Sequence, residues 1–160
     1  MGKSLILYYS LEGSTEKIAS SLAKKIGADI ERVKPIKDIP NKGFSRYLLG
    51  GFQVISKKRP KLNPLKLNPN DYDTIIIGSP IWASNITPAI SSLLESNLLN
   101  KKNIAVFYTF KGGDKDAGIK IKKCVEKNNS LLSILPCLSV ETDLKNQQKK
   151  VYEWAEKLIM

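Results

Sequence analysis

Short apolar runs alternate with amphipathic helical patterns along most of the chain, and this alternation most constrains the fold. Residues 4–9 form the first run, followed by apolar residues that recur at helical spacing from Ile18 to Ile26. Gly27 supplies a C-terminal helix cap, and residues 29–33 are the next predicted strand, which completes one β-α-β unit. Runs that are apolar throughout are typical of strands buried on both faces of a parallel sheet.

The same alternation returns beyond residue 72. Thr87 is predicted as an N-cap, with Pro88 at the first helical position. Together with the first unit, these segments make five strands alternating with helices, and the chain is long enough for one core. We therefore expect an α/β fold, a single domain over residues 1–160 with a parallel sheet covered on both faces. The later predicted strands are 74–77, 103–109 and 134–140, and the later helices are 88–95, 117–127 and the stretch after residue 143.

The segment between the second and third predicted strands is basic and irregular. Residues 43–56 are predicted as a helix interrupted at Gly50-Gly51, and residues 57–71, with three prolines, as a connector. Residues 34–66 hold nine Lys or Arg against one Asp, so this stretch carries +8 of the chain's net charge of +11. It is interpreted as a solvated lysine-rich surface or as a docking surface for an acidic partner.

Composition excludes several kinds of chemistry. The chain has no histidine, which excludes Ser-His-Asp and Cys-His catalysis and removes the commonest zinc and iron ligand. An enzyme with this composition would need a bound cofactor. Cys124 and Cys137 form no CxxC pair and are expected to be reduced core thiols. No apolar run is long enough for a membrane span and no secretory signal or nucleic-acid-binding module is evident, so we expect a cytoplasmic protein without nucleic-acid partners.

Three loops follow predicted strands at the edge where open parallel sheets bind ligands: residues 10–15, 79–85 and 110–114. The first loop combines small residues, a glycine and hydroxyls directly before a helix, which suits an anion. It lacks the glycine patterns of NTPases and dinucleotide-binding folds, so a phosphate monoester is the better interpretation. The alternative is that Ser14 and Thr15 merely cap the helix.

Trp82 in the second loop indicates a flat ligand. It follows a buried strand in a loop that cannot easily hide an indole from water unless something flat covers it. The alternative is a tryptophan packed under a neighbouring loop. Taken with the first loop, Trp82 favours a cofactor that carries both a phosphate and an aromatic ring.

Three segments resemble the FMN-binding loops of the flavodoxin-like superfamily. They are YYSLEGSTEKIA (8–19), YDTIIIGSPIWASNITPA (72–89) and FYTFKGG (107–113). Residues 43–60 are similar to an insertion in a bacterial branch known only as flavodoxin family proteins. The resemblance covers nearly the whole chain and implies a three-layer sandwich whose five-stranded parallel sheet has the order 2-1-3-4-5, an order for which flavodoxin is the type example. It also implies non-covalently bound FMN.

The resemblance implies three groups of FMN contacts. The phosphate contacts are Ser10, Glu12, Gly13, Ser14 and Thr15; the isoalloxazine contacts are Pro80, Ile81, Trp82, Ala83 and Asn85; the contacts to the pyrimidine edge are Phe110, Lys111, Gly112 and Gly113.

Two residues in these loops depart from the family pattern. Glu12 stands where Ser or Thr is common, and we expect its side chain to turn outward from the phosphate. The third loop has no tyrosine for a second stacking ring, so one flavin face is expected to be open or covered by Tyr47 or Phe44. Lys111 is predicted to favour the reduced, negatively charged flavin; the alternative is a solvated lysine.

Three functional classes stay open at this point. The first is an electron carrier between redox proteins, with the basic stretch steering an acidic partner. The second is an FMN-dependent oxidoreductase that passes electrons from NAD(P)H to a quinone or a similar small acceptor. The third is a flavin-free binding or membrane-surface protein.

Overall fold

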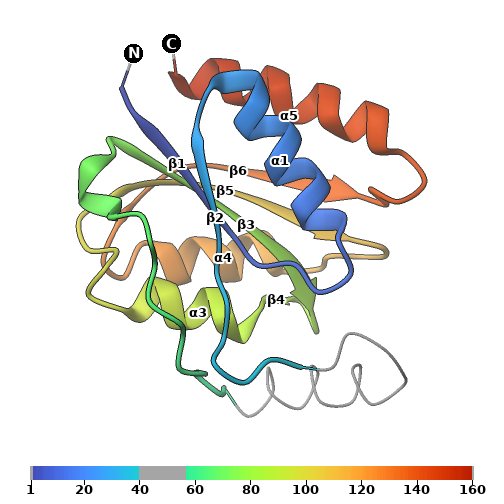
Figure 1. The fold of residues 1–160 in the computed structure, drawn as a ribbon. Coiled ribbons are helices and arrows are strands. Elements are labelled where there is room, and N and C mark those ends of the chain that lie inside the picture. Colours follow the sequence, from blue (N-terminus) through green and yellow to red (C-terminus); the bar gives the residue numbers. More distant parts are fainter. Residues whose placement is uncertain (1, 40–56, 160) are drawn as a thin grey trace.

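Five parallel strands form the centre of the structure, a computed structural model that describes residues 2–39 and 57–159 (Figure 1). The sheet order is β2-β1-β3-β5-β6, and the short strand β4 pairs with β3 outside this path. Counting the five parallel strands alone, this is the predicted order 2-1-3-4-5. The predicted helix at 43–56, together with Tyr47 and Phe44, lies outside the described residues.

The elements follow one another as the alternation predicted. The strands are β1 (Ser4–Tyr8), β2 (Asp29–Arg32), β3 (Thr74–Trp82), β4 (Asn85–Ile86), β5 (Asn103–Phe110) and β6 (Ser130–Leu138). The helices are α1 (Ser14–Ile26), α3 (Pro88–Glu95), α4 (Ala117–Val125) and α5 (Leu144–Ile159), with a 3-10 turn η1 (Pro69–Asp71). The predicted α/β class is confirmed.

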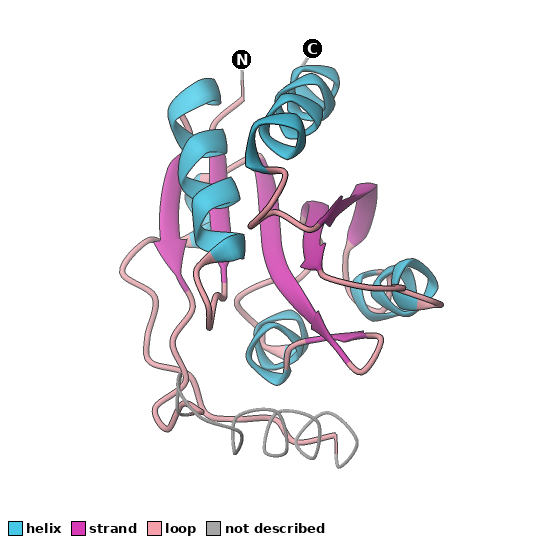
Figure 2. Cartoon of the chain, turned by 90° about the vertical axis from the view of Figure 1, so that its right-hand side faces the viewer, coloured by secondary structure: helices cyan, strands magenta, loops and turns pink. Residues whose placement is uncertain are grey.

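Two apolar cores sandwich the sheet, because successive strand residues point to opposite faces. On one face α1 and α5 pack over Ile6, Ile76 and Phe107. On the other, α3 and α4 pack over Leu7 and Ile77. Figure 2 shows the two helix pairs on either side of the sheet. The central strands β1, β3 and β5 are thus buried on both faces over most of their length, as their continuous apolar runs predicted, whereas the edge strands β2 and β6 are partly exposed.

The largest differences from prediction are at β3 and β6. β3 does not end at Ile77 but continues to Trp82, because its last two residues pair with β4 as an antiparallel hairpin. β6 begins at Ser130, four residues earlier than predicted, and ends at Leu138. Thr87 and Pro88 do start α3, although the Thr87 side chain makes no cap hydrogen bond.

The remaining features of the described chain fit an ordinary α/β domain. Cys124 and Cys137 are free thiols, and burial raises the pKa of Cys137 to about 12. In the parts of the chain that the structure describes, no helix is long and apolar enough to cross a membrane.

Candidate functional site

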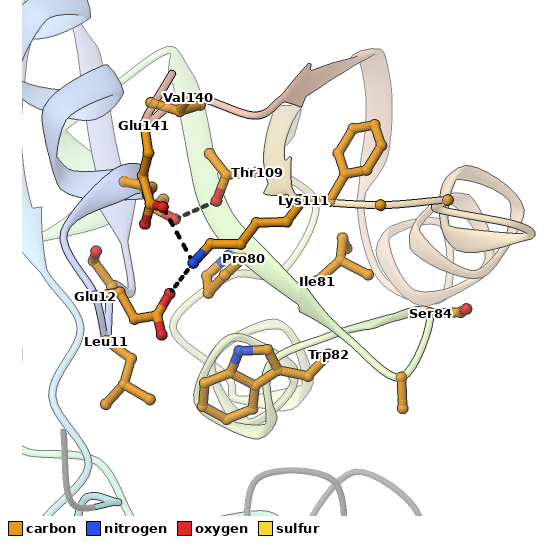
Figure 3. A pocket seen from close by; sticks show the side chains of 17 residues that line it. Leu11, Glu12, Pro80, Ile81, Trp82, Ser84, Thr109, Lys111, Val140 and Glu141 are labelled. Carbon is orange, nitrogen blue, oxygen red and sulfur yellow. Dashed lines mark hydrogen bonds and ion pairs between the residues drawn. The ribbon is translucent and has the colours of Figure 1, made fainter. Parts of the chain in front are cut away.

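A cavity of about 480 Å3 lies where β1, β3 and β5 end, and all three predicted loops line it (Figure 3). Twelve of the fourteen predicted site residues take part: Ser10, Glu12, Ser14, Thr15, Pro80, Ile81, Trp82, Ala83, Phe110, Lys111, Gly112 and Gly113. Gly13 and Asn85 do not line it. Gly13 shapes the first loop and Asn85 shapes the second.

The first loop presents the uncapped start of α1 to the cavity. Gly13 is the N-cap residue with φ of 99°, a left-handed conformation that glycine adopts readily, and its N–H donates to the Ser10 hydroxyl at 3.1 Å. The N-cap residue, Gly13, has no side chain to accept a cap hydrogen bond, and Ser14 and Thr15 lie inside α1. The alternative that Ser14 and Thr15 merely cap the helix is therefore not supported. The first-turn N–H groups carry partial positive charge and are suited to an anion.

Two contacts hold this loop in place. The Thr15 and Thr109 hydroxyls, both buried, lie 2.8 Å apart and join the start of α1 to the end of β5. Arg32, at the end of β2, donates to the Ser10 carbonyl. Its guanidinium also lies 3.7 Å from the Glu16 carboxylate. Sequence reasoning missed Arg32 and Thr109, although the parallel register that pairs Arg32 with Tyr8 would have placed the arginine beside this loop.

A two-residue hairpin forms the second loop. Ala83 and Ser84 both have positive φ, 46° and 59°, which is the requirement of a type I′ turn. Asn85 pairs with Trp82 across the turn, and its side-chain amide donates to the Ala83 carbonyl at 2.8 Å. Ile81 and Trp82 line the cavity, whereas Asn85 lies on the other side of the hairpin, where it lines a second cavity.

Trp82 is only partly buried and forms an apolar wall of the cavity. Its ring meets the edge of Tyr9 at a centroid distance of 5.7 Å and an interplanar angle of 86°. The Tyr9 hydroxyl in turn donates to Asp38 at 2.7 Å, and burial and this hydrogen bond raise the pKa of Tyr9. Trp82 thus packs against Tyr9 and still lines the cavity, where it can contact a flat ligand.

Lys111 in the third loop forms ion pairs with two carboxylates at the cavity. Its Nζ lies 3.0 Å from Glu12 Oε2 and 3.2 Å from Glu141 Oε2 (Figure 3). These hydrogen bonds raise the pKa of Lys111, and the lysine lowers the pKa of Glu141. The expectation that Glu12 turns outward is wrong, because its carboxylate finds a neutralising ammonium across the cavity. The three groups together carry a net charge of −1.

The third loop is anchored by Tyr108, whose hydroxyl donates to Asp114. Burial, with this hydrogen bond, raises the pKa of Tyr108. The Tyr108 and Phe110 rings lie 5.5 Å apart at 40°. In the described part of the chain, no atom beyond the adjacent residues lies within 4 Å of the position a Cβ would take on Gly112 or Gly113, so this side of the loop is open.

Five lining residues were not predicted: Leu11, Ser84, Thr109, Val140 and Glu141. Val140 and Glu141 belong to the connection between β6 and α5. Val140 was missed because residues 134–140 were predicted as strand, and Glu141 because only three ligand-binding loops were predicted. Glu141 also accepts a hydrogen bond from the Ser14 hydroxyl at 3.3 Å, so the fourth loop contacts the first.

Comparison with known proteins gives a family match over almost the whole chain. The family model described as Flavodoxin matches residues 3–158.

Solved structures with the same fold span several bacteria. A flavoprotein from Lactobacillus acidophilus, solved in complex with FMN, is 25% identical, with a TM-score of 0.74 over 85% of this chain and 93% of that chain. A protein from Bacteroides eggerthii, provisionally assigned as a flavoprotein, is 24% identical, with a TM-score of 0.77 over 100% of this chain and 99% of that one. Oxidised flavodoxin 2 from Bacillus cereus is 20% identical, with a TM-score of 0.57 over 97% and 99%. The last two structures, at 24% and 20% identity, show only that the fold is shared.

Proposed function

Because this chain belongs to the flavodoxin family, we propose that it binds FMN non-covalently in the cavity of the three loops and acts as an electron-transfer protein. One observation supports this most: a single cavity has an uncapped helix start at one end and a tryptophan wall at the other. The Lactobacillus acidophilus relative, solved with FMN, supports the choice of ligand.

The cavity residues fit the two halves of FMN. At one end, the N–H groups of the first turn of α1 and the Ser10, Ser14 and Thr15 hydroxyls would hold the phosphate. Gly13 would act through its backbone, because its left-handed conformation sets the direction in which the loop enters α1. Glu12 would take part through its backbone, with its carboxylate neutralised by Lys111.

At the other end, the ring system would lie against Pro80, Ile81 and Trp82. Ala83 borders this wall, and the third loop, from Phe110 to Gly113, would meet the pyrimidine edge. A cavity of about 480 Å3 is of the size that small-molecule cofactors occupy. Asn85 would hold the hairpin rather than touch the ring.

Bound FMN would supply the one- and two-electron chemistry. The protein's own residues would control the electrostatics and the access of water. Lys111 places positive charge, and Glu12 and Glu141 negative charge, within one cluster at the cavity. The balance of these three groups would set how easily the flavin is reduced.

A second function is an FMN-dependent NAD(P)H oxidoreductase that reduces a quinone or a similar small acceptor. The open side of the third loop at Gly112 and Gly113 favours it, because a small reactant would have room beside the ring. The carrier is favoured by the basic charge of residues 34–66, which suits an acidic redox partner. A single-domain, cytoplasmic protein is our expectation for both functions.

The test begins with the visible spectrum of the purified protein and its uptake of added FMN. The FMN-loaded protein is then mixed anaerobically with NADH or NADPH. Reduction only through another redox protein supports the carrier, and bleaching at a catalytic rate supports the oxidoreductase. A colourless protein that takes up no FMN contradicts both functions.

A further inference from the structure

A second cavity, of about 460 Å3, lies between the β3–β4 hairpin, α3 and α4, with residues 57–59 at one side. We call it the basic groove. Its charged lining consists of five cations and one carboxylate, which leaves a net charge of +4. These residues are Lys57, Arg59, Lys120, Lys123, Lys127 and Glu95.

Glu95 orders one wall of the basic groove without neutralising it. Arg59 Nε lies 2.7 Å and Nη2 2.9 Å from the two Glu95 oxygens, a bidentate pair. Lys127 Nζ lies 4.0 Å from the same carboxylate. Within residues 2–39 and 57–159, the side chains of Lys120 and Lys123 make no ion pair. A single carboxylate therefore holds the arginine while most of the positive charge stays available.

The cations converge because of helix geometry. Lys120, Lys123 and Lys127 are spaced three and four residues apart at α4 and its C-terminal end, so they follow one side of the helix. Arg59 lines the same groove and shares the Glu95 carboxylate with Lys127. Ammonium and guanidinium groups gathered around one concave site suit the oxygens of phosphate groups.

The basic groove is next to the first cavity, in which FMN is proposed to bind. Ala83, at the hairpin turn, lines both cavities, and Asn85 on β4 lines the groove. The hairpin is therefore the shared wall. A ligand long enough to pass the turn would have one end among the cations and the other at the open side of the first cavity.

Size and charge distribution favour a small polyanion over an acidic protein. A volume of about 460 Å3 is in the range of small-molecule sites. Protein partners usually bury about 800 Å2 on each side and would not need the cations to meet in one cavity. The apolar floor formed by Ile86 and Pro88 suits the sugar or base of such a ligand.

We propose that the basic groove binds a nucleoside polyphosphate. Its phosphates would lie between Arg59 and the α4 lysines, and its remaining part would point past Ala83 toward the first cavity. The proposal extends the proposed FMN function. The part played by the end of the ligand that reaches the first cavity rests on that function. The binding of phosphates in the groove depends only on the groove's own residues.

The test is calorimetric titration of protein loaded with one equivalent of FMN, using NADP+, NAD+ and ADP as probes. These oxidised or redox-inactive nucleotides cannot reduce the flavin. The key variant is Lys120→Gln/Lys123→Gln. The matched control is Lys150→Gln/Lys157→Gln, which removes two exposed lysines from α5 on the opposite face of the sheet.

We expect Lys120→Gln/Lys123→Gln to weaken NADP+ binding by about tenfold or more, and the control to change it less than about twofold. Tighter binding of NADP+ and NAD+ than of ADP would identify a dinucleotide as the ligand. Equal binding of all three would identify the diphosphate as the recognised group. Binding should weaken as salt is raised.

Three results would overturn the proposal: no binding of any probe, equal losses in both double variants, or binding of poly-glutamate instead of nucleotides at Lys120 and Lys123. The titrations are repeated on FMN-free protein. If that protein takes up no FMN but its nucleotide binding still depends on Lys120 and Lys123, the FMN function fails while the groove assignment stands.

Discussion

Lys111 Nζ lies 3.0 Å from Glu12 Oε2, an ion pair that joins the third loop to the first across the cavity. Lys111 and Glu12 were singled out in the sequence for separate reasons, and the structure shows that they form an ion pair. The pair neutralises a carboxylate where a phosphate dianion is proposed to bind. Glu141, 3.2 Å from the same ammonium, completes the cluster.

Lys111→Gln should weaken FMN binding, because it leaves Glu12 and Glu141 without their cation beside the phosphate. The expected loss is on the order of 1 kcal/mol, about fivefold, since the lysine is well exposed. Glu12→Gln should tighten binding, and the double variant should lie near wild type. Fluorescence titration measures all three. Equal losses for FMN and riboflavin, which lacks the phosphate, would contradict this prediction.

The same cluster should act on the reduction potential of bound FMN. Lys111→Gln should make the flavin harder to reduce, because positive charge is lost near a group that gains negative charge. Glu12→Gln should make it easier to reduce. Potentiometric titration of the FMN-loaded variants measures both shifts, and a potential that Lys111→Gln leaves unmoved would contradict the role given to Lys111.

The stabilising effect of the cluster should depend on pH at both ends of the scale. The pKa of Glu141 is lowered from 4.5 in the folded protein, so its contribution is present above pH 4.5 and is lost as pH falls through the lowered pKa. The pKa of Lys111 is raised from 10.5, so its contribution is present below pH 10.5 and is lost as pH rises further. The difference in unfolding free energy between wild type and Lys111→Gln, from urea titrations, should therefore be constant between these limits. A difference in unfolding free energy that changes near pH 7 would contradict this prediction.

Trp82 should report FMN binding directly. The chain has two tryptophans, and Trp154 lies on α5, with its indole donating to Ser133 at 2.9 Å on the other face of the sheet. FMN should quench more of the emission of Trp154→Phe, which retains Trp82, than of Trp82→Phe. Trp82→Ala should weaken FMN binding by about 1 kcal/mol, about fivefold, because a flat contact is lost. Equal quenching in both Phe variants would place the flavin elsewhere.

Gly78 should tolerate no side chain. A Cβ at this position would lie 2.4 Å from Cζ of the buried Phe107 ring on the neighbouring strand. Gly78→Ala should lower the free energy of unfolding by about 1–3 kcal/mol, and Phe107→Leu should restore part of the loss. Gly118→Ala in α4 is the matched control, since nothing lies within 4 Å of its Cβ position, and it should be neutral or stabilising. Urea denaturation measures these variants, and a Gly78→Ala protein as stable as wild type would contradict the close packing.

The alternation of strands and helices and the positions of the three loops were predictable from sequence because their signals are local. The strand order and the individual site residues were what the family resemblance implied. Apolar runs such as residues 4–8 and a glycine before a helix specify an element and its loop without knowledge of the rest. Trp82 was predictable for the same reason, since it directly follows a buried strand. Of the fourteen site residues that the resemblance implied, twelve line the cavity.

What sequence reasoning missed depends on contacts between distant segments. Glu12 was expected to turn outward because a carboxylate beside a phosphate dianion is unfavourable. Its pairing with Lys111 was missed because the two residues are far apart along the chain, and only the parallel arrangement of β1 and β5 around β3 brings them together. Arg32 and Glu141 reach the first loop in the same way, from β2 and from the loop after β6. The type I′ turn at Ala83-Ser84 was missed because neither residue is the glycine or asparagine typical of that turn.

The most direct test of FMN binding with its phosphate on the α1 N-terminus is a comparison of FMN and riboflavin by fluorescence titration of the purified protein. The two ligands differ only in the phosphate. We predict that FMN binds with one-to-one stoichiometry and at least about 100-fold more tightly, since a dianion held by several N–H and hydroxyl donors contributes about 3 kcal/mol or more. Equal affinities, or no binding of FMN, would contradict the account.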